Sequence, residues 1–187
     1  LNGVIHCGIK TTPGGRIGEA PTLGLSKTLY GFGLTLGRLK TGTPARLSSK
    51  SIDYSLLEVQ KGDKTPENFS FISPKITNKQ IPCFITKTTK ETHKIIKKNI
   101  FKSSINAGKI SGVGPRYCPS IEDKVDRFSD KDSHQIFLEP EGLNSDLVYP
   151  NGISTSLPED IQEKFLRTIP GLENVKIEKY GYAIEYD

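Results

Sequence analysis

The sequence contains no methionine and no tryptophan, and it has only three cysteines and three histidines. A natural start would leave an initiator methionine unless processing removed it, so the opening Leu1 predicts a trimmed or recombinant internal piece of a protein. The cysteines Cys7, Cys83 and Cys118 are odd in number and widely spaced. This argues against a disulfide framework and for a reducing compartment.

The sequence also offers little for metal binding or membrane insertion. It has no C-x-x-C pair, and His6, His93 and His134 show no metal-ligand spacing, so we expect no metal site. No apolar run approaches the roughly 18 residues of a membrane span, and no signal-peptide pattern opens the chain. We therefore expect no membrane span.

Positive charge is present in excess. The formal net charge of +5 and a pI near 9.0 suit a polyanionic partner such as nucleic acid, or simply a lysine-rich surface. A helix is predicted after the capping box Thr88-x-x-Glu91, with Lys94, Lys97 and Lys98 on its outer face. We favour a solvated helix face for these lysines, and contact with RNA is the alternative.

Strands and helices alternate along the chain, which predicts the α/β fold class. A second capping box, Ser156-x-x-Glu159, marks another helix, and Leu23 opens a short one. The expected strands cover residues 3–9, 35–40, 82–86, 134–139 and 182–186.

The composition becomes polar after Arg46, and this change suggests a domain boundary. Residues 1–45 and 118–187 are predicted to form one layered domain. Residues 46–117 are predicted to form an inserted α+β subdomain.

A partial nucleotide-binding pattern lies near the middle of the chain. Gly112-x-Gly114 begins a dinucleotide fingerprint, but Pro115 follows it and Tyr117 takes the place of the third glycine. The pattern alone does not establish nucleotide binding.

Cys118 is the strongest candidate for chemistry. It lies between Arg116 and Lys124, and Ser120 is positioned to cap a helix that begins near Glu122. Cations and a helix N-terminus would favour a reactive thiolate, whereas the usual alternative for a free cysteine is a buried, inert thiol.

Five long runs together resemble the GidA family, and they span nearly the whole chain. They are PGGR at 13–16 with Gly18, GRLKTGTP at 37–44 with Arg46, GPRYCPSIEDK at 114–124, HQIFLEPEG at 134–142 and YPNGISTSLP at 149–158. The polar stretch 48–79 is the part least similar to the family.

The resemblance implies a fragment of a flavin-reductase-type Rossmann domain, which binds FAD and a nicotinamide dinucleotide, with an insertion. The family uses FAD and NADH to modify carbon 5 of the tRNA wobble uridine. It works with a GTPase, MnmE, with a folate-borne one-carbon unit and an amine. The full-length protein is expected to be a homodimer.

The resemblance also assigns roles to residues. Cys118 matches a proposed catalytic nucleophile, and Thr22 matches a position that contacts FAD. Arg38, Lys40 and Arg46 are candidate RNA contacts, with structural pairing to carboxylates as the alternative. The segment assigned to the nicotinamide dinucleotide comprises Gly114, Pro115, Arg116, Tyr117, Pro119, Ser120, Ile121, Glu122, Asp123, Lys124, Val125, Asp126, Arg127 and Phe128 around that cysteine.

Several parts of the family pattern have no counterpart in this chain. They are the N-terminal dinucleotide fingerprint, a second proposed catalytic cysteine and the helical C-terminal region. The chain alone is therefore expected to bind flavin poorly and to be inactive.

Two other functions stay open at this point. One is a non-catalytic RNA- or protein-binding module, and the other is an FAD-dependent oxidoreductase that acts on a small molecule. The Lys- and Asn-rich loops suggest an AT-rich genome or a fungal mitochondrial homologue, so a mitochondrial source is expected, and a bacterial cytoplasm is the alternative.

Overall fold

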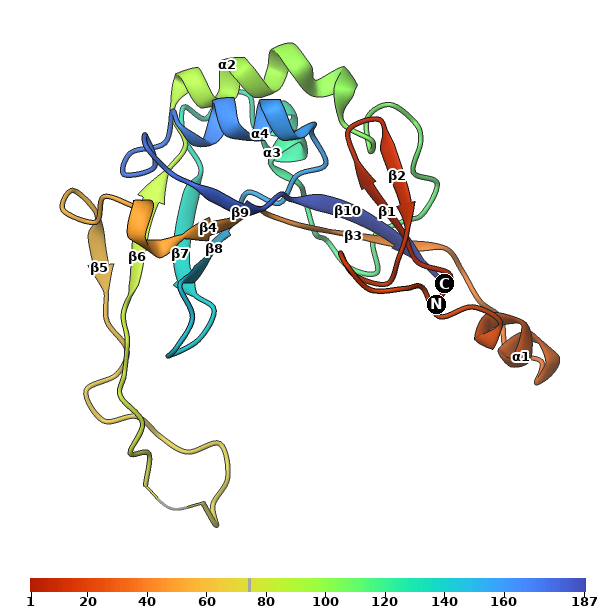
Figure 1. Cartoon of the computed structure of the whole chain (residues 1–187), viewed down its shortest axis with the longest axis horizontal. Helices are drawn as coiled ribbons and strands as arrows, with labels where there is room; N and C mark the ends of the chain where they lie inside the picture. Colours follow the sequence, from red (N-terminus) through yellow and green to blue (C-terminus); the bar gives the residue numbers. More distant parts are fainter. Residues whose placement is uncertain (74) are drawn as a thin grey trace.

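A computed structural model describes residues 1–73 and 75–187, which fold into two antiparallel sheets joined side by side (Figure 1). The first sheet has four strands in the order β2-β1-β10-β3, and the second has six in the order β5-β6-β7-β8-β4-β9. The strands are β1 Val4–Cys7, β2 Lys10–Pro13, β3 Leu39–Thr43, β4 Arg46–Ser48, β5 Glu58–Gln60, β6 Cys83–Lys87, β7 Gln135–Pro140, β8 Leu147–Asn151, β9 Ile177–Lys179 and β10 Tyr182–Tyr186.

The four-stranded sheet brings the two ends of the chain together. Strand β10 lies between β1 and β3, with Ile184 opposite Ile5 on one side and Thr41 on the other. The Asp187 amide donates to the Leu1 carbonyl at 2.8 Å. Helix α1, Leu25–Gly31, projects from this end of the molecule (Figure 1).

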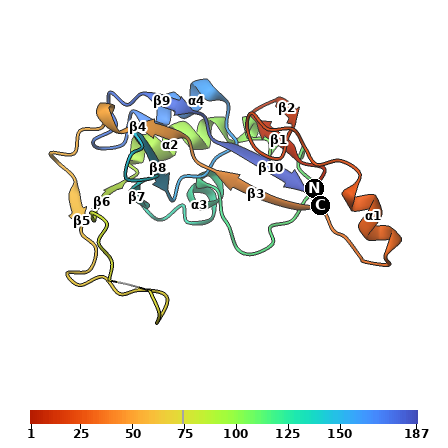
Figure 2. The same ribbon diagram turned by 60° about the horizontal axis from the view of Figure 1, so that its bottom comes forward.

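Helices cover one face of the six-stranded sheet. Helix α2, Lys90–Asn99, packs against α4, Glu159–Leu166, and also against α3, Ile121–Arg127. Figure 2 shows α2 and α4 beside this sheet, with the segment between β5 and β6 extending away from the body. Short 3-10 helices occupy Ser49–Ser51 and Ile100–Lys102.

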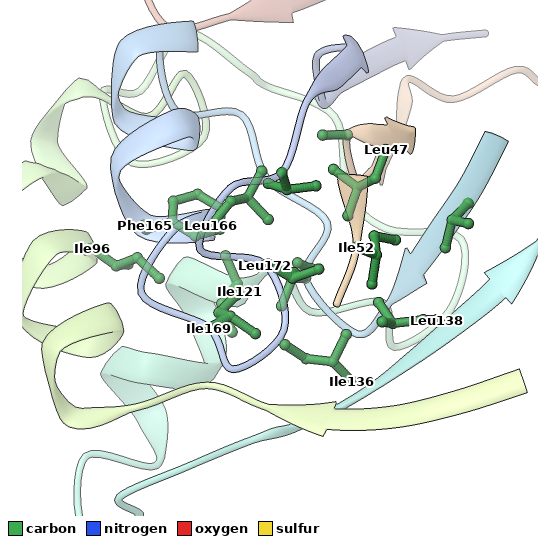
Figure 3. Packing of buried hydrophobic residues seen from close by; sticks show 14 of the residues in the cluster. Leu47, Ile52, Ile96, Ile121, Ile136, Leu138, Phe165, Leu166, Ile169 and Leu172 are labelled. Carbon is green, nitrogen blue, oxygen red and sulfur yellow. The ribbon is translucent and has the colours of Figure 1, made fainter. Parts of the chain in front are cut away.

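Aliphatic side chains from the helices and the sheet form one core (Figure 3). Removing apolar side chains from water stabilises the layers by about 25 cal/mol per Å² of buried surface. The fully buried members include Leu47, Ile96, Ile121, Ile136, Leu138, Phe165, Leu166, Ile169 and Leu172.

Both capping boxes predicted from sequence are wrong, because the hydroxyls have other partners. The Thr88 hydroxyl lies 2.7 Å from His93 Nε2, so α2 is capped one residue later by Thr89 together with Thr92. Ser156 pairs with the Ser103 hydroxyl at 2.8 Å, and α4 begins after Pro158 with no side-chain cap.

The segments predicted as separate units share one sheet. Strands β4, β5 and β6 belong to residues 46–117, and they lie in the same sheet as β7, β8 and β9. The division at residues 46 and 117 stays a prediction. The strand expected at 35–40 forms instead at Leu39–Thr43. None of the helices among the described residues is long and apolar enough to cross a membrane.

Candidate functional site

Cys118 is an exposed free cysteine on a short irregular segment. We call residues 113–119 the strap, because they run between β3 and the start of α3. Tyr117, the preceding residue, is also exposed, and so are Gly114, Pro115 and Arg116. The inert, buried thiol considered for Cys118 is not what the structure shows.

The upstream end of the strap is attached to β3. Val113 forms a parallel bridge with Leu39, and the Val113 carbonyl accepts from the Lys40 amide at 2.8 Å. A Cβ at Gly112 would lie 2.8 Å from the Leu39 carbonyl carbon and oxygen. A glycine is required here because the two backbones approach too closely for a side chain.

A buried carboxylate fixes this end further. Glu185 Oε1 accepts from the Ser111 amide at 2.8 Å and the Gly112 amide at 2.9 Å, while Oε2 lies 3.0 Å from His6 Nε2. Burial acts to raise the pKa of Glu185, but the hydrogen bonds from Gly112 and Ser111 outweigh it, and the pKa is lowered. The ionised carboxylate therefore holds the turn.

The contact of Glu185 with the Ser111 and Gly112 amides also bears on nucleotide binding. A phosphate-binding glycine turn must offer free amides to the phosphate oxygens. Here the Ser111 and Gly112 amides donate to Glu185 instead. The turn does not fit a pyrophosphate cradle, and Arg116 is the exposed cation that the strap offers to a phosphate.

The downstream end of the strap is the capped start of α3. The Ser120 hydroxyl accepts from the Asp123 amide at 3.2 Å, and Asp123 Oδ2 accepts from the Ser120 amide at 3.0 Å. The predicted cap at Ser120 is confirmed, and the helix begins at Ile121. Asp126, Arg127 and Phe128 are exposed at its far end.

Three residues of the predicted dinucleotide segment lie in the core instead of at a surface. Ile121, Glu122 and Val125 have no exposed surface. Glu122 Oε1 accepts from the Thr155 hydroxyl and the Ser156 amide, each at 3.1 Å. Burial raises the pKa of Glu122. These side chains hold α3 in place, and the surface of the segment is formed by their neighbours.

Lys124, on α3, is half-buried. Its Nζ donates to the Gly152 carbonyl at 2.8 Å. Burial lowers the pKa of Lys124, and the charge of Cys118 opposes this by raising it. Lys124 is therefore the α3 cation on which the charge of Cys118 acts.

The other two cysteines differ from Cys118. Cys7 is half-buried, and burial raises its pKa to about 11. Cys83 is also half-buried, with a pKa raised by burial and by Glu139. Cys118 is therefore the one cysteine of the three whose side chain is exposed.

The candidate RNA contacts have different surroundings. Arg38 donates to Asp187 Oδ1 at 2.8 Å, and Arg46 pairs with Glu141 and lies 4.4 Å from the Tyr149 ring centroid. Structural pairing therefore occupies both arginines. Lys40 forms no ion pair within the described part of the chain, and it lies on β3 beside the strap.

Neither Thr22 nor the glycine-rich run at 13–18 forms a hydrogen bond with the strap among the described residues. Thr22 is exposed, and its carbonyl accepts from the Asn2 amide at 3.0 Å. A hollow of about 560 Å³ is lined by Pro13, Arg16, Gly18 and Tyr182 among others, and no strap residue lines it. Its size alone does not make it the reactive site, because it contains no activated nucleophile.

The sequence did not reveal that Glu122 and Glu185 are buried carboxylates: Glu122 was predicted as part of the dinucleotide segment, and Glu185 was not singled out. For Glu185 a signal was present. Alternation along β10 places Glu185 on the same inward face as Ala183, and a charged residue on an inward face needs a specific partner.

Relatives of this chain are known. A family model described as "Glucose inhibited division protein A" matches residues 1–187. A protein of Syntrophotalea carbinolica named "tRNA uridine 5-carboxymethylaminomethyl modification enzyme MnmG" is 60% identical over 187 residues, which are 100% of this chain and 30% of that protein. One of the same name from Bdellovibrio bacteriovorus is 58% identical over 188 residues, covering 100% of this chain and 29% of that protein.

Solved structures match as well. GidA of Aquifex aeolicus in its form I crystal has a TM-score of 0.88 at 54% identity, covering 100% of this chain and 32% of that one. The match confirms the α/β class and the Rossmann-type scaffold of which this chain is a fragment. The chain spans about 30% of the length of the curated relatives. These relatives are bacterial and give no support to a mitochondrial source. Because the family model matches the chain from end to end, the protein belongs to the glucose inhibited division protein A (GidA) family.

Proposed function

We propose that the full-length protein modifies carbon 5 of the wobble uridine in tRNA, and that Cys118 is its nucleophile. The names of the bacterial relatives support the reaction, since they are called tRNA uridine 5-carboxymethylaminomethyl modification enzymes. The observation that carries the residue assignment is the exposure of Cys118 on a strap anchored at both ends. The bacterial relatives favour the bacterial cell over the mitochondrion.

The chemistry explains why a thiolate is useful. Carbon 5 of uracil is a poor nucleophile until a thiolate adds to carbon 6. The new S–C6 bond moves the C5–C6 electron pair onto carbon 5, which then attacks the one-carbon electrophile. Loss of the carbon 5 proton restores the double bond and expels the thiolate, so Cys118 is regenerated. In this proposal Lys124 is the cation that stabilises the thiolate in both the first and last steps.

Cofactors and partners belong to the full-length protein. Bound FAD with NADH would supply the reducing electrons, and a folate-borne one-carbon unit would come with the partner, an MnmE-type GTPase. A homodimer is part of the proposal. In this chain Thr22 is the proposed FAD contact, and Arg116 is the strap cation suited to a dinucleotide phosphate.

The test is a cysteine substitution in the full-length protein. Cys118→Ser replaces the thiol by a hydroxyl, which is a far weaker nucleophile at neutral pH. We expect modification of wobble uridine to fall by about a thousandfold or more, with tRNA affinity retained. Cys83→Ser is the matched control, and it should stay near the normal rate. Normal modification by the Cys118 variant would refute the assignment.

A further inference from the structure

A second charged site lies at the far end of α3 from the strap. A hollow of about 310 Å³ opens between α2 and the segment that follows α3. Four of its lining residues are lysines, and one is an acid. The charged and titratable residues of this lysine hollow are Lys90, His93, Lys94, Lys97, Lys131 and Asp132.

Two of the four lysines are already paired. Lys90 lies 3.0 Å from Asp132, and Lys94 lies 3.6 Å from Glu91. Lys97 and Lys131 form no ion pair with any residue that the structure describes, and both are exposed. Lys97 comes from α2, and Lys131 follows α3 with its ammonium group 5.3 Å from the Phe128 ring centroid, so two cations without ion pairs face one hollow from separate elements.

His93, which lines the hollow, is held by a hydrogen bond and by ring stacking. The rings of His93 and His134 stack at 5.1 Å between centroids. The Thr88 hydroxyl lies 2.7 Å from His93 Nε2 and accepts from the His134 amide at 2.7 Å. Burial is the main cause of the lowered pKa of His93, and Lys97 lowers it further. The histidines are therefore neutral at pH 7, and the positive charge of the site comes from the lysines.

The lysine hollow and Cys118 are linked through α3. The strap meets α3 at its first residue, Ile121, and the hollow is lined by Ser129 and Lys131, just after the last residue, Arg127. The seven residues of α3 span about 10 Å. The two sites therefore lie at opposite ends of one short helix, a separation that one bound nucleic acid can span.

We infer that the lysine hollow binds backbone phosphate of the RNA substrate. The inference rests on the proposed function. Lysine ammonium groups act as point charges for phosphate, and neutralising phosphates supplies most of the sequence-independent affinity for nucleic acid. An acidic protein surface is a different partner, and the test distinguishes it.

The experiment uses the full-length protein with the double substitution Lys97→Gln and Lys131→Gln. Its matched control is Lys164→Gln with Lys176→Gln, which removes the same charge from lysines paired with Asp160 and Glu178. The affinity for tRNA is measured at several salt concentrations. We expect the hollow variant to bind severalfold more weakly and its salt slope to fall by about one to two, with the control little changed.

Two results would overturn the inference. If both double variants weaken tRNA binding equally, the affinity comes from the overall positive charge of the protein and not from this site. Unchanged tRNA binding, with weaker binding of the partner GTPase alone, would make the hollow a protein surface. If the wild-type protein binds tRNA through these lysines but leaves wobble uridine unmodified, the site stands and the proposed function fails.

Discussion

At the scale of single residues, the surroundings of a side chain decide what it does. Three cysteines of the same chemistry divide into two half-buried thiols and one exposed thiol. The sequence placed Cys118 between Arg116 and Lys124 and predicted the Ser120 cap, both of which depend on local spacing. Exposure depends on distant packing, so the sequence left the buried alternative open.

The buried carboxyl group of Glu122 leads to a prediction at the scale of a single residue. Its Oε2 has no hydrogen-bond partner among the described residues, and burial raises its pKa above the ordinary value of 4.5. A raised pKa means that the folded state retains the proton. The contribution of Glu122 to stability is therefore full below its ordinary pKa and is lost as pH rises through the folded value.

We predict that Glu122→Gln removes this pH dependence. The amide keeps a carbonyl oxygen for Thr155 and Ser156 and carries no charge. Hydrogen exchange of the α3 amides between pH 5 and 8 provides the measurement. As pH rises, the equilibrium constant for local opening of α3 should increase severalfold more in the wild-type protein than in the variant. Parallel behaviour of the two proteins would mean that Glu122 stays ionised.

At the scale of elements, the strap depends on three others. Strand β3 bonds to Val113, β10 supplies Glu185, and the cap of α3 fixes the far end. Helix periodicity allowed the helices to be predicted approximately. Their caps were missed where a hydroxyl had a distant partner, as for Ser156 with Ser103. The local sequence does not show which distant group will bond to a hydroxyl that could otherwise cap a helix.

The Glu185 contact predicts the behaviour of the strap. Its pKa is lowered in the fold, so its contribution is present above the ordinary value of 4.5 and lost as pH falls through the folded value. At pH 7, Glu185→Gln removes the charge that binds two backbone amides. Hydrogen bonds to a charged group contribute about 1.5–3 kcal/mol, so the Ser111 and Gly112 amides should exchange at least about tenfold faster.

The control for this variant is Asp187→Asn. Asp187 lies at the end of the same strand region and accepts from Asn2, Ser26 and Arg38, not from the strap. Hydrogen exchange of the Gly112 amide should be unchanged in Asp187→Asn. Faster exchange of the Gly112 amide in the control would show that the effect is not specific to Glu185. Unchanged exchange in Glu185→Gln would show that the bonds to β3 hold the turn without Glu185.

At the scale of the whole molecule, the chain crosses between the two sheets twice. One crossing runs from β3 to β4, and the other from β9 to β10. Alternating strands and helices predicted the α/β class, but not that residues 46–117 would pair with the later strands. Pairing between distant strands is set by packing across the whole core, which local periodicity does not contain.

The arrangement gives the strap and the lysine hollow one common support, the layer of α2, α3 and α4 on the six-stranded sheet. A substrate bound across this layer would reach a nucleophile and a phosphate site at fixed separation. The central claim is that the Cys118 sulfur forms a bond to the uracil ring of that substrate.

The most direct measurement is trapping of that bond. Full-length protein would be incubated with tRNA that carries 5-fluorouridine at the wobble position, because fluorine at carbon 5 blocks the proton loss that releases the thiolate. Mass spectrometry of the digested protein should find the nucleotide attached to the peptide that contains Cys118. Attachment to Cys7 or Cys83 instead, or a protein that modifies normal tRNA yet forms no adduct, would contradict the account.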